Sequence, residues 1–364
     1  MKNGWTGAQY SIFRAALGLY LVVHFAALLP YATEMFSDRG VLSDAWLSPL
    51  ARAFPNVLVA FDAPWVPQAA LVVCVALSLA LLAGWRDRIA AVALWYFWAC
   101  LFGRNPLIAN PSIPFVGWML LAHACLPPAP YGSWAARGRP DARGGWSFPA
   151  PIFFAAWLVM AAGYSYGGYT KLVSTSWIDG TAIYRVIGNP LARPGLIQDA
   201  LLSLPPAIWT IPTWIALALE LLFLPLALVA RARPLLWLAL LGMHFGLMVL
   251  IDFADLSAGM VLIHLLTFDP AWIAPIGGAT LHHGGSAHLQ RFVASEGPLP
   301  VVPGGAFGVL RADGVMLSRS DAVLHLGEAL GGIWRLLAIA ARIVPRRWRD
   351  HLLPGSPAGA PEPG

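Results

Sequence analysis

Apolar residues along the chain gather into eight long stretches, separated by segments that hold Pro, Gly and charged residues. A helix needs roughly 20 apolar residues to cross a bilayer, and each stretch has nearly that length or more. The pattern predicts an all-α polytopic membrane protein with about eight transmembrane helices. We place these at residues 10–30, 65–84, 88–104, 110–128, 149–170, 207–230, 234–253 and 256–275. The third and fourth are short and are separated by a polar segment, residues 103–112.

Arginines in the connecting segments predict the orientation of these helices. With the N-terminus inside, the inner loops carry Arg86, Arg88, Arg137, Arg139, Arg143, Arg231 and Arg233. An excess of basic residues in short loops marks the cytoplasmic side, so both termini are predicted to be cytoplasmic. Two outer loops, 31–64 and 172–206, are too long for simple connections. They either form a lid over the outer face or pack their aromatic residues at the membrane interface.

Composition supports the membrane class. Of the 364 residues, 58% are apolar and 11% are charged, and the mean hydropathy is +0.66. Soluble domains have about 25% charged residues, so a water-soluble enzyme and extensive disorder are both excluded. The net charge of +5 follows from the loop arginines, and no nucleic-acid partner is expected. The three cysteines are isolated and have no metal-ligand spacing.

Ionisable residues at membrane depth are costly and are functional candidates by default. The predicted spans contain Arg14, His24, His123, Glu220, His244 and His264. We expect His24, His123 and His264 to form hydrogen bonds between helices.

Lys171, at the outer end of the fifth span, is a candidate base. The chain has 23 basic residues, and only Lys2 and Lys171 among them are lysines. An amine in a dry pocket can act as a base, which a guanidinium cannot, but a lysine at this depth can also be an interfacial anchor. The base hypothesis requires an apolar cavity beside Lys171. A carboxylate partner such as Asp179 would instead keep the amine charged.

Glu220 and His244 are predicted to be neighbours. Each lies about 11 residues from the short turn around Arg231 and Arg233 that joins the sixth and seventh spans. Two helices joined by a short turn run antiparallel, so the two side chains lie at similar depth. Such a pair can be structural, or it can orient a catalytic imidazole.

After about residue 276 the composition changes to Gly, His, Arg and other polar residues. The pattern predicts a small soluble α+β appendage at residues 279–353 and a disordered tail at 354–364. His282, His283 and His288 suggest either a flexible His-rich link or a metal site, and we favour the link.

The stretch from Gly163 to Ile183 resembles a segment of the vitamin K-dependent gamma-carboxylases and of their bacterial relatives, the horizontally transferred transmembrane (HTTM) proteins. Gly167, Lys171, Leu172, Trp177 and Gly180 carry the match. Arg14, Gly18, Gly40, Glu220 and His244 agree in order, so the resemblance covers about residues 8–275. It implies an HTTM-like domain at 1–278 in a bacterial inner membrane.

In that family the lysine deprotonates reduced vitamin K, and the oxidised product drives carboxylation of glutamate. The resemblance implies Lys171 as the catalytic base, with His244 and Glu220 shaping the site. It also implies that Trp177, Gly167, Arg14 and Phe245 bind substrate, with a reduced, vitamin K-like quinone as cofactor and no metal. The expected partners are membrane lipid, a quinol, and a protein partner or peptide client.

Two departures argue against true glutamate carboxylation. The family's Asn-His-Ser-like stretch is replaced here by Asn110-Pro111-Ser112, and the large lumenal domain is missing. A membrane enzyme that acts on a quinol or another lipid-soluble substrate therefore remains one hypothesis. A non-catalytic scaffold in a maturation or export system is the other; a transporter would need symmetric broken helices, which we do not find.

Residues 307–350 resemble the latter half of DCC-type thiol-disulfide oxidoreductase-like domains, with RSDAVL at 319–324 as the clearest motif. Those domains begin with Asp-Gly-x-Cys-x-x-Cys. The corresponding stretch here, residues 283–289, contains neither cysteine. Disulfide exchange needs a thiolate, so the resemblance implies a degenerate, truncated thioredoxin-like segment without redox activity.

Overall fold

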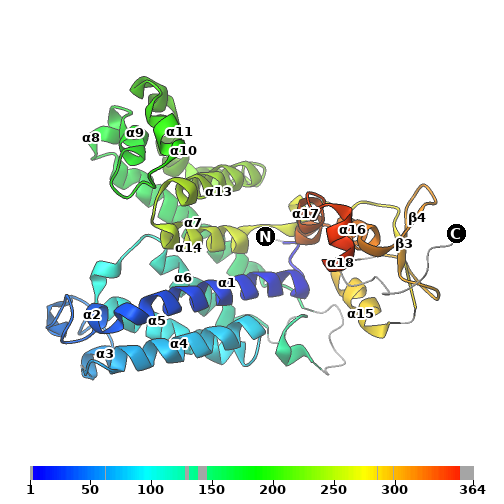
Figure 1. Cartoon of the computed structure of the whole chain (residues 1–364), viewed down its shortest axis with the longest axis horizontal. Helices are drawn as coiled ribbons and strands as arrows, with labels where there is room; N and C mark the ends of the chain where they lie inside the picture. Colours follow the sequence, from blue (N-terminus) through cyan, green and yellow to red (C-terminus); the bar gives the residue numbers. More distant parts are fainter. Residues whose placement is uncertain are drawn as a thin grey trace. The chain divides into compact units, whose positions relative to one another are not determined.

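The computed structural model describes residues 3–61, 63–127, 131–137, 146–284, 286–297 and 299–352. The described chain is mostly helical and has one small sheet near its C-terminal end (Figure 1). Contacts divide the chain into two compact units. The larger unit holds residues 13–126 and 151–268, and the smaller unit holds residues 1–12, 127–150 and 269–364. The predicted tail 354–364, together with Arg139 and Arg143, lies outside the described residues.

The larger unit is built from helices that coincide with the eight predicted apolar stretches. The helices are α1 (Gly7–Leu28, which begins in the smaller unit), α4 (Val66–Ala83), α5 (Asp87–Arg104), α6 (Ile113–Ala124), α7 (Ala150–Lys171), α11 (Thr210–Leu221), α12 (Phe223–Ala227), α13 (Arg233–Leu250) and α14 (Ala254–Thr267). Short helices fill the two long loops: α2 (Ala32–Phe36), α3 (Val57–Ala60), α8 (Thr175–Ile178), α9 (Ala182–Ile187) and α10 (Leu196–Leu202).

Within the described residues, four helical segments are long and apolar enough to cross a membrane: Gly7–Phe36, α4, α7 and α13. A fifth candidate is the pair α10 and Pro206–Leu221, which bends by 100°. The prediction of eight crossings is therefore not confirmed. Helix α5 carries Asp87, Arg88 and Arg104, and α6 and α14 have only 12 and 14 residues. These apolar helices are compatible with a membrane protein.

The predicted sixth span is broken at Leu222, between α11 and α12. Pro225 has no N–H to donate to the carbonyl of Leu221, so the helix cannot continue regularly. The Ser165 hydroxyl of α7 donates to that carbonyl (3.2 Å) and accepts from the backbone N–H of Leu224 (2.9 Å). Ser165 of α7 thus forms hydrogen bonds with backbone groups at the break between α11 and α12.

The smaller unit contains a four-stranded sheet in the order β2-β1-β3-β4. Its elements are β1 (Thr280–His283), α15 (Ala287–Glu296), β2 (Val301–Pro303), β3 (Gly308–Leu310), β4 (Met316–Leu317), α16 (Arg319–Leu330), α17 (Gly332–Ala341) and α18 (Arg346–Leu352). Strand β1 is parallel to β2 and antiparallel to β3, and β3 is antiparallel to β4. The core gathers apolar residues of the sheet, α15 and α16, among them Leu281, Val293, Val309 and Leu326.

The smaller unit also includes the first residues of the chain, so its contacts do not follow the predicted boundary at 278/279. Tyr10 packs against Trp146 and Phe148, with ring centroids 5.1 and 5.5 Å apart. The Thr6 hydroxyl donates to Glu296 at 2.7 Å. Aromatic packing thus joins the start of the chain to residues 146 and 148, and a partly buried hydrogen bond joins it to a residue 290 positions away.

Candidate functional site

A cavity of about 480 Å³ lies within the larger unit. Aliphatic and aromatic side chains from α6, α9, α13 and α14 form most of its wall, including Phe115, Ile187, Leu247 and Met260. Its polar side chains are Tyr164, Lys171, Glu220 and His244. The volume falls within the roughly 300–1,000 Å³ of small-molecule sites, and an apolar wall with few polar groups is typical of such sites.

Lys171 and Glu220 form an ion pair at this cavity. The Lys171 ammonium also lies over the ring of Trp177, 5.1 Å from its centroid. Glu220 is almost fully buried, whereas the Lys171 side chain keeps 27% of its surface exposed. The carboxylate partner of the lysine is thus on α11, and the expected candidate Asp179 has another role. Hydrogen bonds from Thr181 hold the pKa of Asp179 below its ordinary value.

A second polar chain reaches the cavity through Tyr164. Its hydroxyl lies 2.7 Å from Nε2 of His244 and 3.4 Å from Nε2 of His264. Nδ1 of His264 lies 2.9 Å from the carbonyl oxygen of Met260, which can only accept, so this nitrogen carries the proton. Nδ1 of His244 is buried and has no hydrogen-bond partner among the described residues.

These contacts favour one arrangement of protons when both imidazoles are neutral. If Tyr164 donates to His264, then Nε2–H of His244 donates to Tyr164, and every contact is satisfied. His244 is left with a bare Nδ1 that can accept one hydrogen bond. The opposite arrangement leaves a buried N–H and a buried lone pair without partners, which costs free energy. His244 therefore lines the cavity while its bare Nδ1 is buried in the protein beside it.

Two glycines allow α7 and α11 to approach closely beside the cavity. A Cβ at Gly168 would lie 2.6 Å from the backbone nitrogen of Leu221, too close for any side chain. At Gly167 it would lie 3.6 Å from Oε2 of Glu220 and 3.7 Å from Nζ of Lys171, an ordinary packing distance. Gly168 thus sets the helix separation, and Gly167 keeps the space beside the ion pair free.

Five of the seven predicted site residues line this one cavity: Lys171, Glu220, His244, Trp177 and Gly167. Glu220 and His244, predicted to be neighbours, line the same cavity, but their hydrogen-bond partners among the described residues are Lys171 and Tyr164 of α7, respectively. Phe245, one residue beyond His244 on the helix, is half exposed and is not part of the lining.

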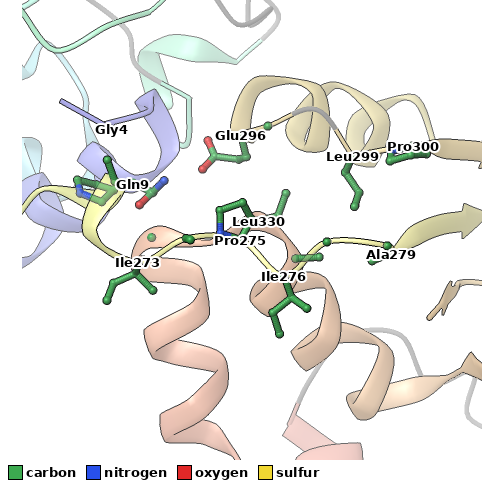
Figure 2. A pocket seen from close by; sticks show the side chains of 18 residues that line it. Gly4, Gln9, Ile273, Pro275, Ile276, Ala279, Glu296, Leu299, Pro300 and Leu330 are labelled. Atoms are coloured by element: carbon green, nitrogen blue, oxygen red, sulfur yellow. The ribbon is translucent and has the colours of Figure 1, made fainter. Parts of the chain in front are cut away.

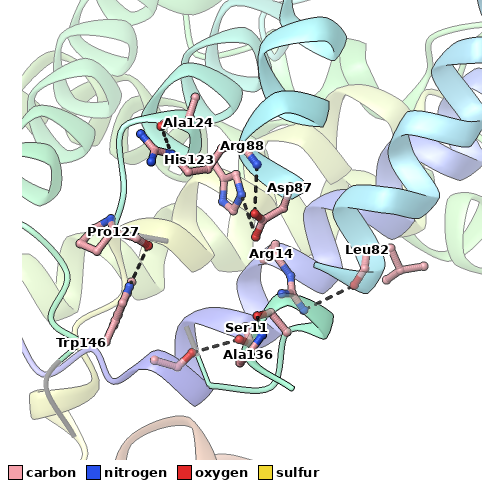
Figure 3. Close-up of polar contacts among 12 residues, drawn as sticks. Ser11, Arg14, Leu82, Asp87, Arg88, His123, Ala124, Pro127, Ala136 and Trp146 are labelled. Carbon is pink, nitrogen blue, oxygen red and sulfur yellow. Dashed lines mark hydrogen bonds and ion pairs between the residues drawn. The ribbon is translucent and has the colours of Figure 1, made fainter. Parts of the chain in front are cut away.

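Arg14 is also absent from the cavity lining. It is buried, and its Nη2 donates to the carbonyl of Leu82 at 3.4 Å. Figure 3 shows it near Asp87, whose carboxylate lies 3.5 Å from Nε2 of His123. Arg88 beside them donates to the carbonyl of Ala124 at 2.8 Å. Arg14 therefore belongs to a buried polar cluster that joins α1, α4, α5 and α6.

The histidines expected to join helices do so partly through carboxylates that sequence analysis overlooked. His24 of α1 lies 2.7 Å from Asp255 of α14, which also accepts from Tyr20 at 3.0 Å. His264 instead contacts Tyr164 and the backbone of Met260. Tyr164 was overlooked too, although it lies seven residues before Lys171. That spacing puts both on one face of a helix and was the available signal.

The smaller unit holds a second cavity, of about 320 Å³ (Figure 2). Its lining is mostly aliphatic and proline, with Gln9 and Glu296 as polar side chains. Glu296 accepts hydrogen bonds from Thr6 and from the indole of Trp334. Burial raises the pKa of this carboxyl above its ordinary value. The carboxyl ties the start of the chain to α15 and α17, which is a structural role.

Among the described residues, no three His, Cys, Asp or Glu side chains are placed to hold a metal ion. His282 and His283 belong to strand β1 and His288 to helix α15, so the expected flexible His-rich link is instead regular structure. Ser286 caps α15, with its hydroxyl accepting from the backbone N–H of Leu289 at 3.3 Å.

Comparison with known proteins finds a weak similarity to a curated protein. No family model matches the chain, and no solved structure matches it. The chain is similar to a curated protein of Bacillus subtilis (strain 168) named "Uncharacterized protein YitO", with 27% identity over 209 residues. The match covers 54% of this chain and 66% of YitO, just under two thirds of that relative. This similarity does not assign the chain to a family, and the relative's name states no activity.

Proposed function

We propose that the chain is an integral membrane protein that binds a quinol, or another lipid-soluble hydroxyl compound, in the cavity of the larger unit. The supporting observation is the Lys171–Glu220 ion pair in the wall of a 480 Å³ apolar cavity. A quinol supplies a hydroxyl group that can lose a proton and a ring that can be oxidised. The same proposal includes the likeness to HTTM proteins and gamma-carboxylases, localisation in a bacterial inner membrane, and cytoplasmic termini.

The ion pair has the composition that a proton acceptor needs. In an apolar site, Lys171 and Glu220 can exchange the shared proton and become a neutral amine and a neutral acid, because burial disfavours charge. The Lys171 amine then takes a proton from the ligand hydroxyl. The ammonium that results lies beside the ligand oxygen and offsets its negative charge, an attraction that a low dielectric strengthens. The imidazole of His244, in the wall of the same cavity, packs against the ligand and orients it.

The test uses the purified full chain in nanodiscs with menadiol, a reduced naphthoquinone, as the probe. Lys171→Arg keeps the cation but removes the base, so we expect menadiol to bind while its oxygen-dependent oxidation falls by about 10²–10⁴-fold. Arg193→Lys, an exposed exchange in the outer loop that follows α7, is the control and should change neither quantity. Unchanged oxidation by Lys171→Arg would disprove the base.

The second candidate is a non-catalytic scaffold. It is favoured by the complete set of partners that Lys171 already has in Glu220 and Trp177, since a satisfied ion pair can serve to position two helices. Pro111 also stands where the gamma-carboxylases have a histidine, and a chain without that histidine agrees with the scaffold. Failure of menadiol to bind the wild-type chain would favour this scaffold.

For the smaller unit we propose a degenerate, truncated thioredoxin-like domain. Its β1-α15-β2 unit followed by a hairpin and α16 supports this proposal, because thioredoxin-like domains have that order of elements. Ser286 at the start of α15 occupies the region where such domains carry a reactive cysteine. Disulfide reductase activity of the full chain at this unit would contradict the proposal.

A further inference from the structure

Helices α17 and α18 display an unusually apolar outer surface. Its exposed residues are Leu336, Leu337, Ile339, Ile343, Val344, Trp348 and Leu352, and the Ile343 side chain keeps 86% of its surface exposed. Three of them lie on α17, Ile343 and Val344 lie in the turn that follows it, and Trp348 and Leu352 are four residues apart on one face of α18. We call these seven residues the apolar face of the smaller unit.

The smaller unit holds this face in place. Ile333 and Ala338 of α17 are buried, and Trp334 packs edge-on against Phe292 at 5.5 Å. Asp350 of α18 accepts from the backbone of Ser320 at 3.1 Å. The apolar residues are therefore presented outward by anchored helices.

Positive charge surrounds the apolar face. Residues 332–352 contain the arginines Arg335, Arg342, Arg346, Arg347 and Arg349, and Asp350 is their one acid. Arg342 pairs with Glu328, and Arg346 and Arg349 pair with Asp321. The five arginines and the three acids, Glu328, Asp321 and Asp350, together have a net charge of +2. Arg347 is exposed and has no ion pair among the described residues.

We propose that the apolar face docks on the anionic surface of the lipid bilayer. A helix with Leu, Ile and Trp on one side and arginines beside them lies in the membrane interface, where apolar residues enter the acyl boundary and cations meet lipid phosphates. The covalent chain allows this contact. The backbone of Gly332 donates to Ile273 at 2.8 Å. Ile273 follows the last residue of α14 by six residues, a reach of at most about 20 Å.

This inference does not depend on the proposed quinol chemistry. A soluble protein or a second copy of the chain would also cover apolar residues, but the surplus of arginine favours phosphate-bearing lipid. The prediction of a cytoplasmic C-terminus agrees, because anionic lipid is concentrated at that surface.

The experiment uses the full chain in nanodiscs, labelled with an environment-sensitive fluorophore at Ile343→Cys. Cys125 is replaced by Ser, since Cys74 and Cys100 are buried. In phosphatidylcholine nanodiscs that also contain phosphatidylglycerol, we expect blue-shifted emission and quenching by brominated lipid, both reduced by salt. A label at Asp313→Cys, in the turn before β4, should report water throughout.

Charge reversal supplies the matched pair of variants. Arg347→Glu should lower the ratio of docked to free label by about 30-fold, because it changes the local charge by two and each basic residue near an anionic surface contributes about 1 kcal/mol. Arg291→Glu, an exposed reversal on α15, should leave the ratio unchanged. Water-like emission from residue 343 in every nanodisc would overturn the proposal. So would shielding that depends on protein concentration and not on lipid charge, since it would indicate a protein interface.

Discussion

At the scale of single residues, the Tyr164 hydroxyl is the group whose loss has the clearest consequence. Tyr164→Phe leaves Nε2 of both His244 and His264 without a partner in a buried environment. We expect the unfolding free energy to fall by about 1–3 kcal/mol, the cost of a buried polar group left unsatisfied. Thermal unfolding in detergent measures it, with Tyr166→Phe, an exposed residue on the same helix, as the control. Equal melting temperatures for the two variants would contradict the contribution of these two hydrogen bonds to stability.

Glu296 gives a pH-dependent prediction. Burial raises its pKa in the folded state, so the folded protein binds this proton more tightly than the unfolded chain does. Its contribution to stability is therefore largest below the ordinary carboxyl pKa and is lost as pH rises through the raised value. Glu296→Gln does not titrate, so its melting temperature relative to wild type should rise with pH.

Asp350→Asn provides the opposite control for that experiment. A hydrogen bond from Ser320 lowers the pKa of Asp350 in the folded state. Its carboxylate stabilises the fold above the ordinary pKa, and the contribution is lost as pH falls through the lowered value. The melting temperature of Asp350→Asn relative to wild type should thus fall as pH rises. If the melting temperatures of both variants, relative to wild type, changed with pH in the same direction, one of the two assigned pKa shifts would be wrong.

At the scale of helices, the contact between α7 and α11 depends on Gly168. Gly168→Ala places a methyl group 2.6 Å from the backbone of Leu221, so the helices must separate beside the Lys171–Glu220 pair. We expect a loss of about 1–3 kcal/mol, as for overpacked cores. Gly242→Ala on α13 has nothing within 4 Å and should gain up to about 1 kcal/mol from helix propensity. Chemical unfolding of both variants measures the difference.

Hydropathy located the helices well, because burial in lipid or protein demands apolar runs whatever the partner. It did not separate the helices by length and charge, since α5 carries charged residues and α14 has 14 residues, and eight crossings are not confirmed. The partners in the site were harder to predict. Lys171 and Glu220 are 49 residues apart, and the close approach at Gly168, together with the hydrogen bonds of Ser165, brings α7 and α11 together. Spacing along one helix cannot specify a contact between two.

At the scale of the whole molecule, reporter fusions distinguish between four, five and eight crossings. Four, five and eight crossings give different sides for particular loops when the N-terminus is inside. With eight, the segment after Ala109 is outside, the turn after Ala232 is inside and residue 280 is inside. With four, these positions are inside, outside and inside. With five, in which the bent pair ending at Leu221 crosses, they are inside, inside and outside.

We predict the eight-crossing pattern for reporter fusions at these three positions. Arg231 and Arg233 flank Ala232, and arginines in a short turn are retained on the cytoplasmic side, which argues against four. Residues 172–195 would be outside in every case, so a fusion after residue 190 serves as the common control. A fusion after Ala109 that reports inside would remove α5 and α6 as crossing helices. An outside result at 280 would select five crossings and would put α17 and α18 beyond the reach of the cytoplasmic lipid surface.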